Sequence, residues 1–163
     1  MVTSVRDEGS LFTALFVSNF YEKNLTAISR PGYFHHQFLI DVLQVLHIPG
    51  ADNLQFVNSI KKDYFKTSEL GSLEGVLPGL SAIIGRYLIK DPGYQIARLN
   101  AERAPTYLLS FEYENKAGNT FFNFLAPGGS QNKVKPGVAH ADDLIYVFYT
   151  GIFDRFGEHD TLS

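Results

Sequence analysis

The sequence predicts an α/β fold. Two segments, at residues 1–5 and 106–113, have the composition of strands, and segments between them space their apolar residues as helices do. A stretch rich in Gly, Asn, Pro and Lys follows the second strand, and a last helix follows that stretch. Strands and helices that alternate in this way are typical of α/β proteins.

Each element is marked by its composition. The β-branched residues at 1–5 favour a short strand that ends at Arg6-Asp7-Glu8-Gly9, and Ser10 is a residue type that caps helices. Residues 107–113 are apolar enough for a strand in the interior of a sheet. Helices are expected over residues 33–46, from residue 52, over 77–89 and over 94–104, with breaks at Pro31-Gly32, Pro49-Gly50 and Asp91-Pro92-Gly93. Two strands are too few for a sheet that stands alone, so we interpret the chain as part of a larger domain.

Composition excludes several classes of protein. The net charge of −3 argues against a partner that is nucleic acid or an anionic membrane. No segment approaches 18 apolar residues, so we expect no membrane span. The sequon Asn24-Leu25-Thr26 is a candidate glycosylation site if the chain enters the secretory pathway. We expect a secreted protein whose signal peptide lies upstream, because the first residues contain no apolar core of a signal.

Two short motifs are candidates for chemistry. Val-Thr-Ser-Val-Arg-Asp-Glu-Gly-Ser-Leu-Phe occupies residues 2–12, and Gly-Val-Ala-His-Ala-Asp-Asp-Leu-Ile-Tyr-Val-Phe occupies residues 137–148. Taken alone, Glu8 is also what a solvated acid at the start of a helix looks like. A lone histidine such as His140 is more often a surface or capping residue. The flanking residues make the functional interpretation the stronger one in both cases.

The first motif resembles the acid-bearing turn of the type-B carboxylesterase/cholinesterase family, and the second is similar to its histidine motif, especially as found in insect esterases. Residues 94–99, 101–103 and 106–113 resemble the helix and strand that precede that motif. The resemblance implies part of an α/β-hydrolase fold, with a central, mostly parallel sheet and helical insertions, incomplete at both ends. It also implies hydrolysis of small carboxylic esters through an acyl-enzyme, with Glu8 as triad acid, His140 as triad histidine and no metal or organic cofactor.

Within a single such domain, the chain would be the C-terminal portion. It would comprise an acid turn at residues 1–12, a helical region at 13–104, a strand at 106–113, and a histidine loop and helix at 137–150. The triad of α/β-hydrolases appears in the order Ser, acid, His, which these positions fit. We expect Glu8 to accept a hydrogen bond from one imidazole nitrogen and the other nitrogen to take the proton of a serine.

The nucleophile is absent from the sequence. A nucleophile elbow needs Gly-x-Ser-x-Gly, and Gly79-Leu80-Ser81-Ala82-Ile83 has only its first half. We therefore expect the serine and the oxyanion hole on a missing N-terminal portion. Two alternatives stay open. A non-catalytic binding or adhesion protein of the same fold has no reason to keep both Glu8 and His140, and an independent helical interaction domain leaves the two strands unexplained.

The remaining candidates favour structural roles. His35 and His36 are adjacent, so they point in different directions on a helix, and no third metal ligand is suitably spaced. His47 and His159 fit no pattern. Asp142 and Asp143 are expected to anchor the loop and the start of the last helix. The family often has Gly where this chain has Ala141, and we expect that change to be mild in a helical first turn.

Overall fold

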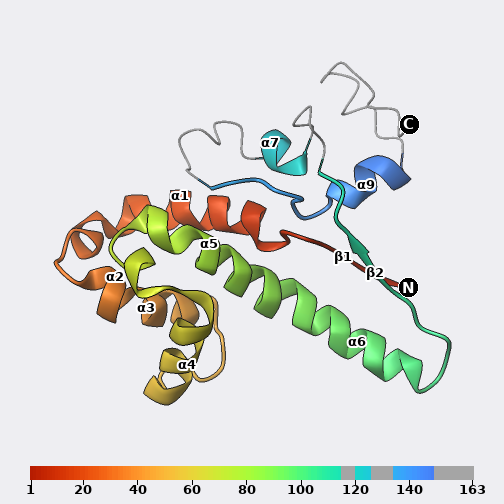
Figure 1. Ribbon diagram of the computed structural model, residues 1–163, viewed down its shortest axis with the longest axis horizontal. Helices are drawn as coiled ribbons and strands as arrows, with labels where there is room; N and C mark the ends of the chain where they lie inside the picture. Colours follow the sequence, from red (N-terminus) through yellow and green to blue (C-terminus); the bar gives the residue numbers. More distant parts are fainter. Residues whose placement is uncertain (115–119, 126–133, 149–163) are drawn as a thin grey trace.

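The computed structural model describes residues 1–114, 120–125 and 134–148, apart from the side chains of 18–25 and 124. In chain order (Figure 1), the elements are β1 (Val2–Val5), α1 (Gly9–Ile28), α2 (Tyr33–His36), α3 (Phe38–Val45), α4 (Leu54–Tyr64), the 3-10 turn η1 (Thr67–Glu69), α5 (Leu73–Ile84), the π-helix η2 (Gly85–Lys90), α6 (Asp91–Ala101), β2 (Leu108–Phe111), α7 (Phe121–Leu125) and α9 (Asp142–Val147). The predicted loop at residues 115–137 lies largely outside the described part.

The two strands are parallel neighbours. Val2 is opposite Leu108 and Val5 is opposite Phe111, and the amide of Arg6 extends the pairing by donating to the Phe111 carbonyl at 3.1 Å. Because the family resemblance implies a mostly parallel sheet, parallel pairing of these two strands was expected, and it is confirmed. Within the described residues β2 is not interior, because Leu108–Ser110 are exposed, so the expectation of an interior strand at 107–113 stays a prediction. No described segment pairs with the outer edge of β2.

The helices α5, η2 and α6 follow one another without a break and form one long rod (Figure 1). The predicted break at Asp91-Pro92-Gly93 is therefore wrong. In an α-helix, the ring of a proline collides with the carbonyl four residues earlier. For Pro92 that carbonyl belongs to Leu88, which lies in the wider turn of the π-helix. The proline therefore takes an early position in α6 instead of ending the helix.

Other boundaries also differ from the prediction. Helix α1 begins at Gly9, so Ser10 lies inside it; its hydroxyl is buried without a hydrogen-bond partner among the described residues. The helix expected over residues 33–46 is divided at Gln37, where φ is −115°. Asn53, by contrast, caps α4 by accepting from the amides of Gln55 and Phe56 at 2.9 and 3.3 Å.

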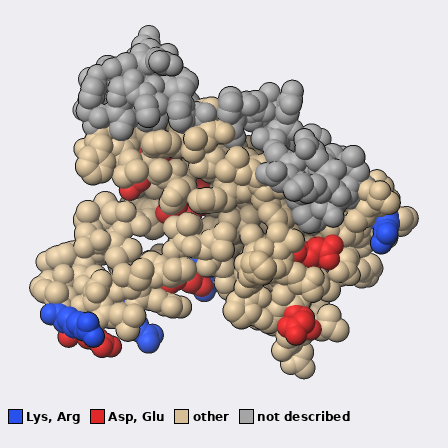
Figure 2. All heavy atoms as spheres, turned by 180° about the vertical axis from the view of Figure 1, so that it is seen from behind, with Lys and Arg blue, Asp and Glu red and all other residues tan. Residues whose placement is uncertain are grey.

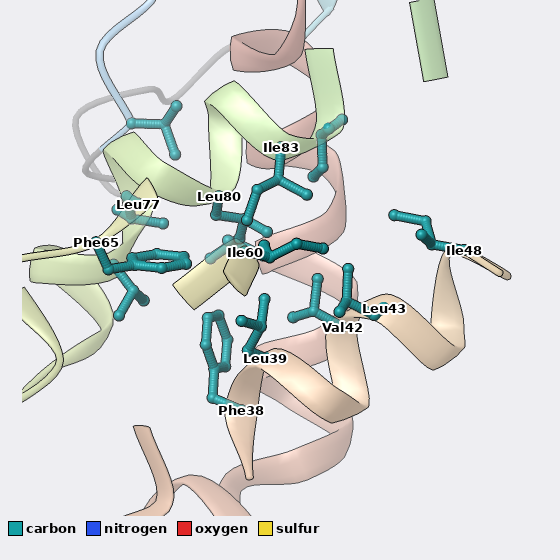
Figure 3. Packing of buried hydrophobic residues seen from close by; sticks show 14 of the residues in the cluster. Phe38, Leu39, Val42, Leu43, Ile48, Ile60, Phe65, Leu77, Leu80 and Ile83 are labelled. Carbon is teal, nitrogen blue, oxygen red and sulfur yellow. The ribbon is translucent and has the colours of Figure 1, made fainter. Parts of the chain in front are cut away.

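The hydrophobic core lies among α1, α3, α4 and α5. Phe38, Val42 and Leu43 of α3 are each at most 1% exposed, and they face Leu80 and Ile83 of α5 across Ile60 of α4 (Figure 3). Burying one such side chain contributes about 1.5–3 kcal/mol. This core holds α1 on its inner side through Leu11, Ala14 and Val17, and the first residues of α1 directly follow the acid turn.

Two glycines allow α1 to begin against the rod. A Cβ on Gly9 would lie 1.9 Å from the Ser81 carbonyl oxygen, and a Cβ on Gly85 would lie 2.7 Å from the Gly9 nitrogen. Both obstructions are main-chain atoms, which cannot rotate away. The start of α1, and with it the acid turn, is therefore fixed by direct contact between two backbones.

We predict that Gly9→Ala destabilises the chain by about 2 kcal/mol or more, because the new methyl group overlaps the backbone of α5. Gly71→Ala is the matched control, since nothing lies within 4 Å of a Cβ at Gly71, and its effect should stay within about 0.5 kcal/mol. Urea denaturation followed by circular dichroism measures both. Equal stability of the two variants would contradict the close contact.

Candidate functional site

The carboxylate of Glu8 is buried at the end of β1. The residue is 3% exposed, and its Oε1 accepts a hydrogen bond from the Val5 amide at 2.8 Å. The turn that carries it is closed by the Ser10 amide, which donates to the Asp7 carbonyl at 3.0 Å. One oxygen of Glu8 is thus held by its own strand, and the orientation of the other is fixed.

That other oxygen faces His140. Nδ1 of His140 and Oε2 of Glu8 are 2.7 Å apart, although the two residues are 132 positions apart in the sequence. The predicted contact is confirmed. A carboxylate can only accept, so Nδ1 carries the proton and Nε2 is the nitrogen left to act as a base. The side chain of His140 is 40% exposed, and the ring of Phe12 lies 5.2 Å from the imidazole, centroid to centroid.

The hydrogen bond to Glu8 raises the pKa of His140 above 6.5. Partial burial acts in the opposite direction, and the charges of Glu8, Asp143 and Asp142 add to the increase. Glu8 therefore stabilises the imidazolium, which is the form that a general base reaches after it has taken a proton.

Asp142 anchors the loop that carries His140, as expected. It is 4% exposed, its Oδ2 accepts from the Ala139 amide and its Oδ1 accepts from the Phe121 amide, both at 2.7 Å. Burial raises the pKa of this carboxyl to about 6, and the two amide bonds lower it only in part. Asp143 is half-buried and contributes only its charge to the site.

The expectation that alanine is a mild change at position 141, in a helical first turn, is wrong. Ala141 is the N-terminal flanking residue of α9 and has φ 71°, in the left-handed region, so it does not belong to a helical first turn. A residue with a Cβ is strained there by about 1–2 kcal/mol, whereas glycine is not. The strain follows from the sharp reversal between His140 and Asp142.

The other candidates lie outside this pair. Ser81 is in α5, within the helix expected over residues 77–89, and not in a nucleophile elbow. The described residues contain no cluster of three acidic or histidine side chains suited to a metal. His35 and His36 lie side by side with ring centroids 6.2 Å apart. The side chain of Asn24 and all of His159 are outside the described residues.

An open groove of about 1120 Å³ lies beside the acid turn. Its walls come from α5, η2, α6 and residues 134–137, and its charged groups include Arg86 and Lys90. Arg86 is bound to Asp91 at 3.3 Å, and Lys90 donates to the Arg6 carbonyl at 2.9 Å. Glu8 is among the residues that line the groove, and His140 is not.

Sequence reasoning missed what holds the acid turn in place. Neither the contact of Gly9 with Gly85 nor the hydrogen bonds between Asp7 and Val138 were predicted. A signal existed for Gly85, because a glycine inside a helical pattern often marks a close approach of backbones.

A model of the carboxylesterase family matches residues 1–161. The chain belongs to the carboxylesterase family. This family has the α/β-hydrolase fold, and the paired strands and helical region of the chain are consistent with part of it. Comparison with curated proteins gave no match, and comparison with solved structures gave none either.

We predict that Glu8→Gln lowers the pKa of His140, because the substitution removes the negative charge and the strongest acceptor from Nδ1. Titration of the His140 Cε1–H resonance by NMR measures the change. Glu112→Gln, on an exposed residue of the strand region, is the control and should leave the titration unchanged. A titration of His140 that is the same in both variants would argue against the hydrogen bond.

We also predict how stability varies with pH. The pKa of His140 is higher in the folded chain than in the unfolded chain, so its contribution is complete below about pH 6.5 and is lost as the pH rises through the folded value. Asp142, with a folded pKa of about 6 against 3.8, reduces stability as the pH rises between those two values. Urea denaturation above pH 6.5 isolates the contribution of His140 to stability. His140→Gln should flatten that part of the plot of stability against pH.

Proposed function

We propose that this chain supplies the acid and the base of a serine carboxylesterase triad. Membership of the family supports ester hydrolysis in general, and the contact of 2.7 Å between Glu8 and His140 is the observation that carries the proposal. In this role, Glu8 holds Nδ1 protonated and stabilises the imidazolium. Nε2 takes the proton of a serine hydroxyl as it attacks the ester carbonyl, and then returns the proton to the leaving alcohol.

We propose further that a polypeptide segment outside the printed sequence carries the serine and the oxyanion donors. The sequence contains no Gly-x-Ser-x-Gly, and Ser81 lies within a helix rather than at a strand-to-helix turn. In this interpretation residues 1–163 are the C-terminal portion of one α/β-hydrolase domain, and the remaining strands of the sheet come from the other segment.

The exposed surface of β2 supports this assembly. Tyr107, Leu108 and Leu109 are 69%, 58% and 46% exposed, and among the described residues the backbone of β2 pairs on one side only. An apolar strand with an open edge is a template for a further strand. On α9 and just after it, Val147 and Phe148 are 67% and 59% exposed. Large apolar side chains grouped in this way mark a surface that another segment covers.

The face of the described residues seen in Figure 2 gives no support to a nucleic-acid partner. The face seen in Figure 2 is mostly uncharged, and the basic side chains of the described residues form no continuous patch on it. Among the residues with described structure, none of the helices is both long and apolar enough to pass through a bilayer. Members of the carboxylesterase family are often secreted, and we propose secretion and glycosylation at Asn24 for this protein.

We predict that the chain alone does not hydrolyse 4-nitrophenyl acetate at an enzymatic rate. It lacks the nucleophile, and the loss of one oxyanion donor alone lowers kcat by about 10²–10³-fold. The chain joined to its preceding segment, or co-folded with it, should be active. In that protein His140→Ala should lower kcat by about 10⁴-fold or more, whereas His36→Ala, on an exposed histidine, should not.

Two results would contradict the proposal. Hydrolysis by the chain alone that survives His140→Ala would place the chemistry elsewhere. A preceding segment without Gly-x-Ser-x-Gly, together with no turnover, would favour the binding or adhesion protein instead.

A further inference from the structure

The acid turn holds the histidine loop through Asp7 as well as through Glu8. The amide of Asp7 donates to the Val138 carbonyl at 2.9 Å, and the Val138 amide donates to Oδ2 of Asp7, also at 2.9 Å. Val138 is fully buried, so its amide cannot find water as a replacement partner. Asp7 precedes Glu8 directly, and Val138 precedes His140 by two positions, so these two bonds join the backbones that carry the proposed triad.

We propose that Asp7 is a positioning residue, whose carboxylate fixes the main chain at Val138 and thereby keeps Nδ1 of His140 within reach of Glu8. This inference rests on the function proposed above. Asp7 does not touch the imidazole; it acts through two peptide units of the loop. Glu8 makes the contact with the histidine, and Asp7 fixes the position of the main chain two residues before it.

The carboxylate of Asp7 is itself held from the solvent side. Nε of Arg6 donates to the same Oδ2 at 2.8 Å, and a terminal nitrogen of Arg6 donates to Glu114 at 2.7 Å. Asp7 and Arg6 are 38% and 43% exposed, and ion pairs with such exposure add little to stability. Their effect is one of orientation, because the bond from Arg6 keeps Oδ2 of Asp7 directed at the Val138 amide.

Gly137 shows how closely this carboxylate is fitted to the loop. A Cβ at Gly137 would lie 2.2 Å from Oδ2 and 2.6 Å from Cγ of Asp7, and the residue has φ 56°. The loop therefore approaches Asp7 as closely as a backbone without a side chain allows. The substitution Gly137→Ala should push the carboxylate away from Val138, and removing the carboxylate should relieve part of the damage.

Asp142 provides an internal reference. Its Oδ2 accepts from the Ala139 amide at 2.7 Å, so the amides of two consecutive residues are bound by carboxylates from opposite ends of the chain. Loss of Asp7 should free the amide of Val138 and leave that of Ala139 bound. A general loss of stability would free both.

The test uses Asp7→Ala and Asp7→Asn in the whole chain. In Asp7→Ala, exchange of the Val138 amide should accelerate about tenfold relative to Ala139, and the pKa of His140 should fall toward 6.5 as its bond to Glu8 weakens. Asparagine keeps an acceptor oxygen but not the charge, so Asp7→Asn should stay close to the original chain in both. Glu112→Ala, on an exposed carboxylate, is the control for removal of charge.

Two outcomes overturn the proposal. One is an unchanged His140 titration and Val138 exchange in Asp7→Ala. The other is an equal shift in Asp7→Asn, which would assign the effect to charge instead of to the hydrogen bond. If Asp7→Ala does not fold, Gly137→Ala takes its place, and it should accelerate exchange of the Val138 amide and lower the pKa of His140. Adding Asp7→Asn to Gly137→Ala should not increase either effect. None of these measurements needs an ester, so a failure of the proposed function would appear separately, as no turnover by the complete protein with a normal response of His140.

Discussion

The hydrogen bond between Glu8 and His140 closes a loop of the chain, since its two residues lie 132 positions apart. The entropy of closing so long a loop exceeds what one hydrogen bond to a half-exposed histidine contributes, which is about 1.5–3 kcal/mol for a charged acceptor. The contact persists because other interactions also close the same loop. The parallel pairing of β1 with β2 brings the chain back beside its start, and the bonds of Asp7 to Val138 hold it two residues before the histidine.

The hydrophobic core and the candidate site occupy different places, and helix α1 connects them. Its first turn follows Glu8 and touches η2, while Leu11, Ala14 and Val17 hold the same helix in the core with α3 and α5. A helix is stiff along its axis, so a start fixed at Gly9 and a middle fixed by apolar packing define the position of Glu8 without any contribution from the histidine. The acid is in this sense preorganised, and the histidine loop docks onto it.

The sequence revealed the site more reliably than the elements between its two halves. Glu8 and His140 were predicted as a pair because their neighbours form motifs that resemble those of the family, and the same resemblance implied a mostly parallel sheet. Three features were not predicted from the pattern of residue types. The π-helix absorbs Pro92, Ala141 adopts a left-handed conformation to reverse the loop, and β2 is exposed although its residues are those of an interior strand. Periodicity describes one regular segment at a time, so it carries no information on a change of helix type, a positive φ or the exposure of a strand.

The state of His140 links the exposed surface to the proposed chemistry. A general base must be unprotonated when it acts, yet the bond to Glu8 raises the pKa of this histidine. Burial is the opposing influence, and it is incomplete here because the side chain is 40% exposed. If another segment covers β2 and α9, it also removes water from the neighbouring imidazole, and loss of water favours the neutral form. The segment that supplies the serine would then also lower the pKa of His140 toward the pH at which the enzyme operates. The contact with Glu8 would not have to change.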